Sequence, residues 1–137
     1  MKTIDMACIR YLNLFGRVTG IRTNSCFLYN RALVFAVPQH LVSKAIGEQG
    51  RNVRQMISIV KKKIKIVSAP ETPADCGRFI AEIVSPVGFK SIEVTSNEII
   101  ISANRQSKAS LIGRDKVRLQ ELEKITKEMF NKNIRII

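Results

Sequence analysis

The sequence repeats itself at an offset of 66 residues. In this register two strand-like segments, a glycine turn and a helical pattern align: 25–28 with 91–94, 32–37 with 98–103, Ile46-Gly47 with Ile112-Gly113, and Val53, Met56 and Ile59 with Leu119, Leu122 and Ile125. Four extra residues near the end shift 64–67 onto 134–137. Because a fixed internal period indicates repeated structural units, we expect two domains, 1–68 and 69–137.

Hydrophobic periodicity predicts the elements of the first copy. Met6, Ile9, Leu12 and Phe15 have helical spacing, and Gly16 follows as a helix terminator. Strands over 26–29 and 33–37 then flank the short Asn30-Arg31 connection. A helix over 39–46 and a glycine turn lead into a second helix whose buried face should hold Val53, Met56, Ile57 and Val60. A strand over 64–67 closes the unit.

The hydrophobic pattern of the second copy predicts the same order of helices and strands. We expect a helix over 75–84, strands over 91–95 and 98–102, two helices and a last strand over 134–137. The fold class is therefore α/β (α+β), with two tandem αββααβ units. Each should contain a three-stranded mixed sheet packed against three helices.

The positive charge is concentrated in the first copy. Residues 1–68 contain twelve Lys or Arg and two Asp or Glu, whereas 69–137 contain eleven and nine. A basic surface gains affinity for nucleic acid by releasing the counterions of the phosphates. An anionic membrane surface is the alternative, but it would require a basic amphipathic helix, and the densest cluster, 61–65, runs into a strand-like segment. Nucleic acid is therefore the leading candidate partner.

The turn between the two helices of the first copy is the candidate binding site. Gly47 and Gly50 allow the chain to reverse and a sugar-phosphate backbone to approach, and the start of the next helix offers amides to a phosphate. The predicted RNA-binding set combines this turn with neighbouring cations: Lys44, Ile46, Gly47, Glu48, Gln49, Gly50, Arg51 and Arg54.

A helix-GxxG-helix corner beside a three-stranded sheet resembles the KH domain, whose GxxG loop clamps about four nucleotides. With its helix first, the order resembles the type II form. The tandem pair, with 37–54 in the first copy and Ser85-Pro86 in the second, looks most like the short archaeal type of NusA transcription factor. The resemblance implies a non-enzymatic single-stranded RNA-binding factor in transcription elongation, termination or antitermination, with RNA polymerase as a possible partner. A KH-containing structural component of a ribonucleoprotein such as the ribosome is the alternative.

The second copy departs from the GxxG pattern, because Lys116 stands where the second glycine would be and Asp115 adds negative charge. A side chain there should restrict the backbone and the approach of a phosphate. Four residues of this turn remain candidates for electrostatic contact: Gly113, Arg114, Lys116 and Arg118. We expect weaker or altered RNA binding at this turn, with partner docking or support of the first unit as the competing role.

Other residue types do not form a recognisable reactive site. His40 is the single histidine, and Cys8, Cys26 and Cys76 are widely spaced, so neither a metal centre nor a disulfide framework is expected. Asp5, Asp75 and Glu82 suit helix starts or a helix face. We therefore expect no cofactor, no small-molecule substrate and no enzymatic activity, with a small metal-dependent nuclease as the third hypothesis. Apolar runs far shorter than about 20 residues and the lack of a leader predict a cytoplasmic protein. The phenylalanines Phe15, Phe27, Phe35 and Phe79 are expected in the core, not as base-stacking platforms.

Overall fold

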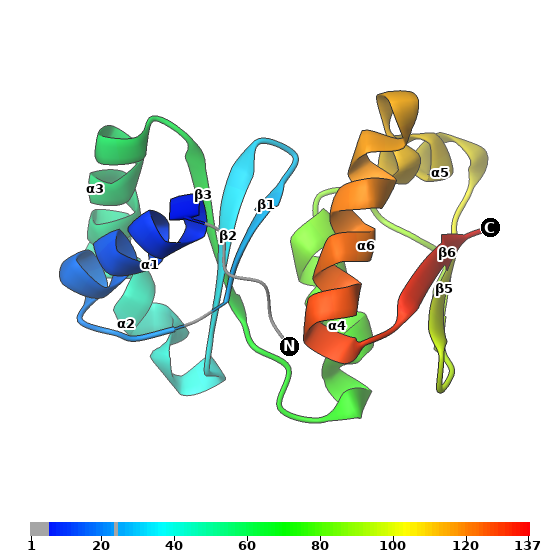
Figure 1. The fold of residues 1–137 in the computed structure, drawn as a ribbon, viewed down its shortest axis with the longest axis horizontal. Coiled ribbons are helices and arrows are strands. Elements are labelled where there is room, and N and C mark those ends of the chain that lie inside the picture. The colour runs from blue at the N-terminus through cyan, green and yellow to red at the C-terminus, as the bar shows by residue number, and fades with distance from the viewer. Residues whose placement is uncertain (1–5, 24) are drawn as a thin grey trace. The chain divides into compact units, whose positions relative to one another are not determined.

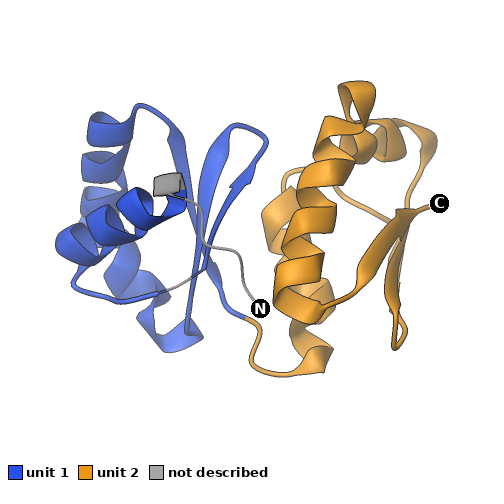
Figure 2. Ribbon diagram, in the orientation of Figure 1, with its two compact units in different colours: residues 1–69 blue, residues 70–137 orange. Residues whose placement is uncertain are grey.

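The computed structural model describes residues 6–23 and 25–137. The chain forms two compact units, Met1–Ala69 and Pro70–Ile137 (Figure 2). Residue 69 lies with the first unit because its amide donates a hydrogen bond of 2.7 Å to the carbonyl of Val37. Both units have the order αββααβ and a three-stranded mixed sheet, which confirms the expected α+β fold class.

The first unit places its helices on one side of its sheet (Figure 1). Its elements are α1 (Met6–Thr19), β1 (Cys26–Tyr29), β2 (Ala32–Val37), α2 (Val42–Ile46), α3 (Arg51–Val60) and β3 (Lys63–Ser68), with short 3-10 turns at Gln39–Leu41 and Glu48–Gly50. Strand β2 is central, antiparallel to β1 and parallel to β3. Asn30 and Arg31 both have positive φ, the backbone of a tight two-residue hairpin turn.

The core of the first unit joins the helices to one face of the sheet. Phe15 of α1 stacks on Phe35 of β2 with ring centroids 4.6 Å apart. Met56 of α3 is fully buried in the same cluster. Phe27 is also buried, so all four phenylalanines expected in the core are confirmed there: Phe15, Phe27, Phe35 and Phe79. These rings are not available for stacking on bases.

Helix α1 does not end at Gly16 as the sequence suggested. It continues to Thr19, and Gly20 is the residue that takes positive φ, with its amide bonded to the Gly16 carbonyl at 2.9 Å. The Thr19 hydroxyl donates to the Phe15 carbonyl at 2.7 Å and accepts from the Ile21 amide at 3.1 Å. The extra turn brings Ile21 into the core, which outweighs the weak helix preference of Gly16.

The predicted buried face of α3 is correct only in part. Met56 is inaccessible, and Val53 and Val60 are half-buried, but Ile57 is 39% exposed. Ile59 is also exposed, although its counterpart Ile125 is buried. Ile57 lies about 100° around the helix from Met56, outside the strip that packs on the core.

The second unit repeats the arrangement with a longer last helix. Its elements are α4 (Cys76–Val84), β4 (Ser91–Val94), β5 (Glu98–Ser102), α5 (Arg105–Ile112), α6 (Val117–Phe130) and β6 (Asn133–Ile136), with 3-10 turns at Pro73–Asp75 and Arg114–Lys116. Strand β5 is central, antiparallel to β4 and parallel to β6. Fully buried Phe79, Ile99, Leu122 and Ile125 belong to its core. Across the described ranges, no helix is long and apolar enough to cross a membrane.

Candidate nucleic-acid interface

The Gly47–Gly50 turn reverses the chain between α2 and α3. Gly47 has φ 83° and ψ 166°, a combination that is essentially restricted to glycine. A Cβ atom at this position would lie 2.9 Å from Cγ and 3.0 Å from the backbone nitrogen of Asn52. Gln49 and Gly50 then take left-handed conformations, with φ of 55° and 74°. The first glycine is therefore required by both its backbone angles and its close contact.

The turn is held by hydrogen bonds at each side. The Gly47 amide donates to the Ser43 carbonyl at 3.0 Å, and the Gly50 amide donates to the Gly47 carbonyl at 3.1 Å. The Arg51 amide donates to Glu48. The turn itself thus uses the amides of Gly50 and Arg51, so the start of α3 does not have all the unpaired amides that the sequence suggested. The positive end of the α3 dipole remains directed at the turn.

Two side chains of α3 brace the turn. Asn52 donates through Nδ2 to the Lys44 carbonyl at 3.2 Å, which links the end of α2 to the start of α3. The Arg54 guanidinium donates to the main-chain carbonyl of Gln49. Sequence reasoning missed Asn52 and treated Arg54 as a mobile cation. An Asn in the first turn of a helix after a glycine turn was the available signal, since such residues often bond nearby backbone groups.

The predicted first-turn residues all lie at this corner. Lys44, Arg51 and Arg54 are exposed, as are Glu48 and Gln49. Half-buried positions complete the set: Ile46, Gly47 and Gly50. Within the described part of the first unit, Glu48 is the one carboxylate, and no ion pair joins it to another described residue. The corner can therefore offer cations, a helix dipole and a narrow glycine backbone to an anionic strand.

The second turn has nearly the same backbone. Gly113 has φ 75° and ψ 172°, and Asp115 and Lys116 take φ of 55° and 62°. The Lys116 amide donates to the Gly113 carbonyl at 3.2 Å, as Gly50 does to Gly47. The chain therefore follows the same path with lysine in place of the second glycine. Lys116 adopts the left-handed backbone conformation at a free-energy cost of about 1–2 kcal/mol relative to glycine.

The side chains around the second turn differ more than its backbone. Arg118 forms an ion pair with Glu121 at 2.8 Å, and both side chains are about one-fifth exposed. Its aliphatic carbons pack against Gly113, where a Cβ atom would lie 2.7 Å from Arg118 Cγ. Arg118 is therefore occupied with a partner of its own helix. Arg114 and Lys116 are the predicted cations that stay exposed here.

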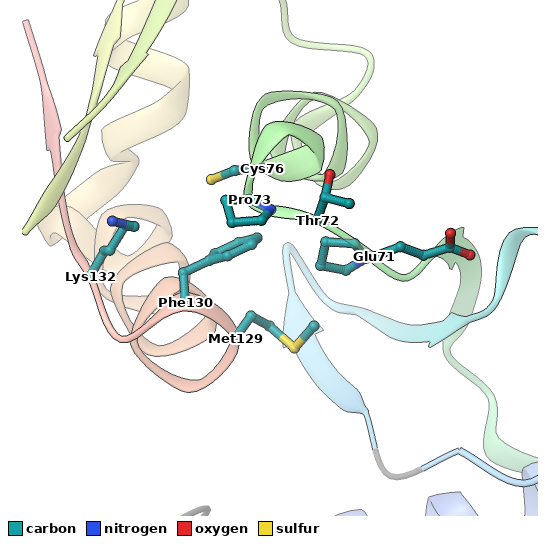
Figure 3. A pocket seen from close by; sticks show the side chains of 8 residues that line it. Glu71, Thr72, Pro73, Cys76, Met129, Phe130 and Lys132 are labelled. Carbon is teal, nitrogen blue, oxygen red and sulfur yellow. The ribbon is translucent and has the colours of Figure 1, made fainter. Parts of the chain in front are cut away.

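A cavity of about 360 Å³ in the second unit is the other candidate (Figure 3). Cys76 and Phe130 line it, and burial raises the pKa of the Cys76 thiol, an effect that the Lys132 ammonium opposes. The Lys132 ammonium donates to the main-chain carbonyls of Thr95 and Ser96. Glu71 points away from the thiol and the ammonium. The cavity therefore does not bring together an acid-base pair.

The remaining candidates from the sequence have structural surroundings. Asp75 accepts the amides of Glu71 at 3.0 Å and Thr72 at 3.2 Å, and Glu82 pairs with Arg78 at 2.9 Å. His40 is exposed, and Asp5 lies outside the described residues. Cys8, Cys26 and Cys76 form no disulfide bond with one another, and residues 6–23 and 25–137 contain no metal-binding cluster.

Asp75 caps the Pro73–Asp75 turn, because its carboxylate accepts the backbone amide of Thr72 at the start of that turn. The pH dependence of stability tests this capping role. The Glu71 and Thr72 amides lower the pKa of the Asp75 carboxyl. A depressed pKa contributes stability above the ordinary pKa of aspartate, about 3.9, and that stability is lost as the pH falls through the folded-state value. Asp75→Ala should therefore destabilise the protein at pH 7, and the difference from the parent should shrink below about pH 4. A difference in denaturant midpoint that is the same at acidic and neutral pH would contradict this role.

Comparison with known proteins places the fold. No family model matches the chain, and a search of curated proteins finds no match. A solved structure described as "Crystal structure of APE1850" is similar, with a TM-score of 0.67 and 21% sequence identity. The match covers 98% of this chain and 99% of that one. The likeness supports the two-unit α+β fold over the whole chain.

Proposed function

We propose that this protein is a non-enzymatic single-stranded RNA-binding factor, and that its first unit binds RNA in the manner of a KH domain. The observation that carries the proposal is the Gly47–Gly50 turn, with Lys44, Arg51 and Arg54 exposed around it. A strand of phosphates fits a corner that combines a helix dipole, exposed cations and closely approachable backbone. The resemblance to short NusA-type factors suggests a role on nascent RNA in the cytoplasm, in elongation or termination.

The two turns should contribute unequally to RNA binding. In the full chain, Lys44→Ala combined with Arg51→Ala should weaken binding of a single-stranded RNA at least tenfold, about 1.4 kcal/mol. If about four phosphates are neutralised, log affinity against log salt should have a slope near −3 for the parent and near −1.5 for this variant. Fluorescence anisotropy across a salt series measures both quantities.

The matched control removes two charges from the second turn. Arg114→Ala with Lys116→Ala should change affinity by less than about threefold, or 0.7 kcal/mol. Equal losses in the two double variants would contradict the assignment of binding to the first unit. A parent protein without affinity for single-stranded RNA would overturn the proposed function itself.

The cellular role requires a separate experiment. Affinity purification of the tagged chain should recover RNA polymerase if the protein acts during transcription. Co-sedimentation with ribosomal subunits in high salt, without polymerase, would instead identify a ribonucleoprotein component. The Gly47–Gly50 turn would contact RNA in a transcription factor and in a ribonucleoprotein component alike. The protein partner that is recovered therefore distinguishes these two roles.

A further inference from the structure

The solvent face of α3 carries a row of cations that begins at the glycine turn. Arg51, Arg54 and Lys61 occupy positions i, i+3 and i+10, with Ser58 at i+7, so these four residues share one face of the helix. All four are exposed, whereas Met56 on the opposite face is fully buried. We call Arg51, Arg54, Ser58, Lys61 and the adjacent exposed Lys62 the α3 row.

The α3 row extends well beyond the turn. Lys61 is ten residues from Arg51, which is about 15 Å at 1.5 Å per residue. It ends the helix in a left-handed conformation, and its amide donates to the Ile57 carbonyl at 2.8 Å. The sequence from 49 to 69 contains no Asp or Glu, so no carboxylate of this segment neutralises the row. The positive electrostatic field of the α3 row can therefore attract an external polyanion.

The second unit shows that the fold does not require this row. At the matching positions of α6, Val117 and Gln120 replace the two arginines, and Lys124 and Lys127 alternate with acidic neighbours. Arg118 of that helix is paired with Glu121. The continuous cationic face is therefore a property of the first unit, where the intact glycine turn also lies.

We propose that the α3 row holds the continuation of the RNA strand that binds at the turn, so that the site exceeds about four nucleotides. This inference rests on the proposed function. Continuity supports it, because Arg51 and Arg54 belong to both the turn and the row. The exposed Ile57, four residues before Lys61 and about 40° from it around the helix, offers apolar surface beside the row to the bases of a strand whose phosphates follow the cations.

RNA accounts for the row better than a membrane surface does. A helix that lies on a bilayer inserts its apolar face among the lipids. The apolar face of α3 instead belongs to the core, where Met56 is inaccessible and Val60 packs against the cluster. The cations of the row therefore stay exposed while the strip of α3 around Met56 is buried in the core, which is the arrangement that suits phosphates in water.

The test compares two RNA lengths on the full chain. Lys61→Ala combined with Lys62→Ala should weaken binding of a single strand of about twelve nucleotides five- to tenfold, but that of about four nucleotides less than twofold. The salt slope for the longer strand should become shallower by about 1.4. Lys124→Ala with Lys127→Ala removes the same charge from α6 and should leave both affinities unchanged.

Several results would overturn this inference. Equal weakening on both lengths would mean that the lysines act only through the overall field, and no weakening would remove them from the site. Loss of binding to phosphatidylserine vesicles with unchanged RNA affinity would assign the row to a membrane. The proposed function can hold even if the inference about the α3 row is wrong. This would be the case if the parent binds the short strand, Lys44→Ala with Arg51→Ala abolishes that binding, and Lys61→Ala with Lys62→Ala has no effect specific to the longer strand. A parent that binds neither strand would overturn both.

Discussion

Gln49→Asp should weaken single-stranded RNA binding at least tenfold, about 1.4 kcal/mol, without unfolding the protein. Two like charges 4 Å apart repel by about 4 kcal/mol at an effective dielectric constant of 20, and salt and solvent reduce that value at an exposed turn. The fold should tolerate the change because Asp115 has φ 55° and ψ 27° in the second turn, against φ 55° and ψ 30° for Gln49. The bond from Arg54 goes to the main-chain carbonyl and can persist.

Gln49→Asn is the matched control for this substitution. Asn has the size of Asp and tolerates the left-handed region equally well, but it adds no charge. It should bind RNA within about twofold of the parent, less than 0.5 kcal/mol. Thermal midpoint and RNA affinity should be measured for both variants together. If Gln49→Asp is folded and binds like Gln49→Asn, the RNA backbone does not pass this turn.

Gly47→Ala should be the most destabilising single change at the corner. Its backbone angles alone cost about 1–3 kcal/mol for a residue with a side chain. The added Cβ atom would also lie within 3.0 Å of Asn52, partly against its backbone nitrogen, so the neighbour cannot simply rotate away. We expect a loss of at least 2 kcal/mol, roughly the upper half of that range, together with loss of RNA binding.

Gly50→Ala separates this effect from glycine flexibility in general. The space at Gly50 is open, since the nearest atom to an added Cβ is Arg54 Nη1 at 3.7 Å, and Lys116 already holds the equivalent conformation. Its cost should be about 1 kcal/mol. Denaturant unfolding followed by fluorescence of a label in the first unit measures both variants. Equal losses at the two glycines would show that the contact with Asn52 does not matter.

The corner shows how much of the site could be predicted from residue types and spacing. Two glycines three positions apart, with Lys44 before them and Arg51 and Arg54 after them, were sufficient to locate an exposed cationic turn. The Arg118–Glu121 pair is three residues apart on one helix and could also have been anticipated from the sequence. The position of Asn52 indicates that its side chain bonds a nearby backbone group, but its partner, the Lys44 carbonyl, lies across the turn and depends on the angle between two helices, which the sequence does not show.

The repeated αββααβ order and the buried phenylalanines could be predicted from the sequence, because hydrophobic periodicity and glycine position act over a few residues and the same pattern occurs twice. Features that depend on packing between residues far apart in the sequence could not be predicted in this way. Helix α1 passes Gly16 because Ile21 gains a place in the core, and Ile57 stays exposed because the core covers only the strip around Met56. The Lys116 turn keeps its shape because the helices on either side fix its ends, and a backbone held at both ends can overcome the preference of one residue.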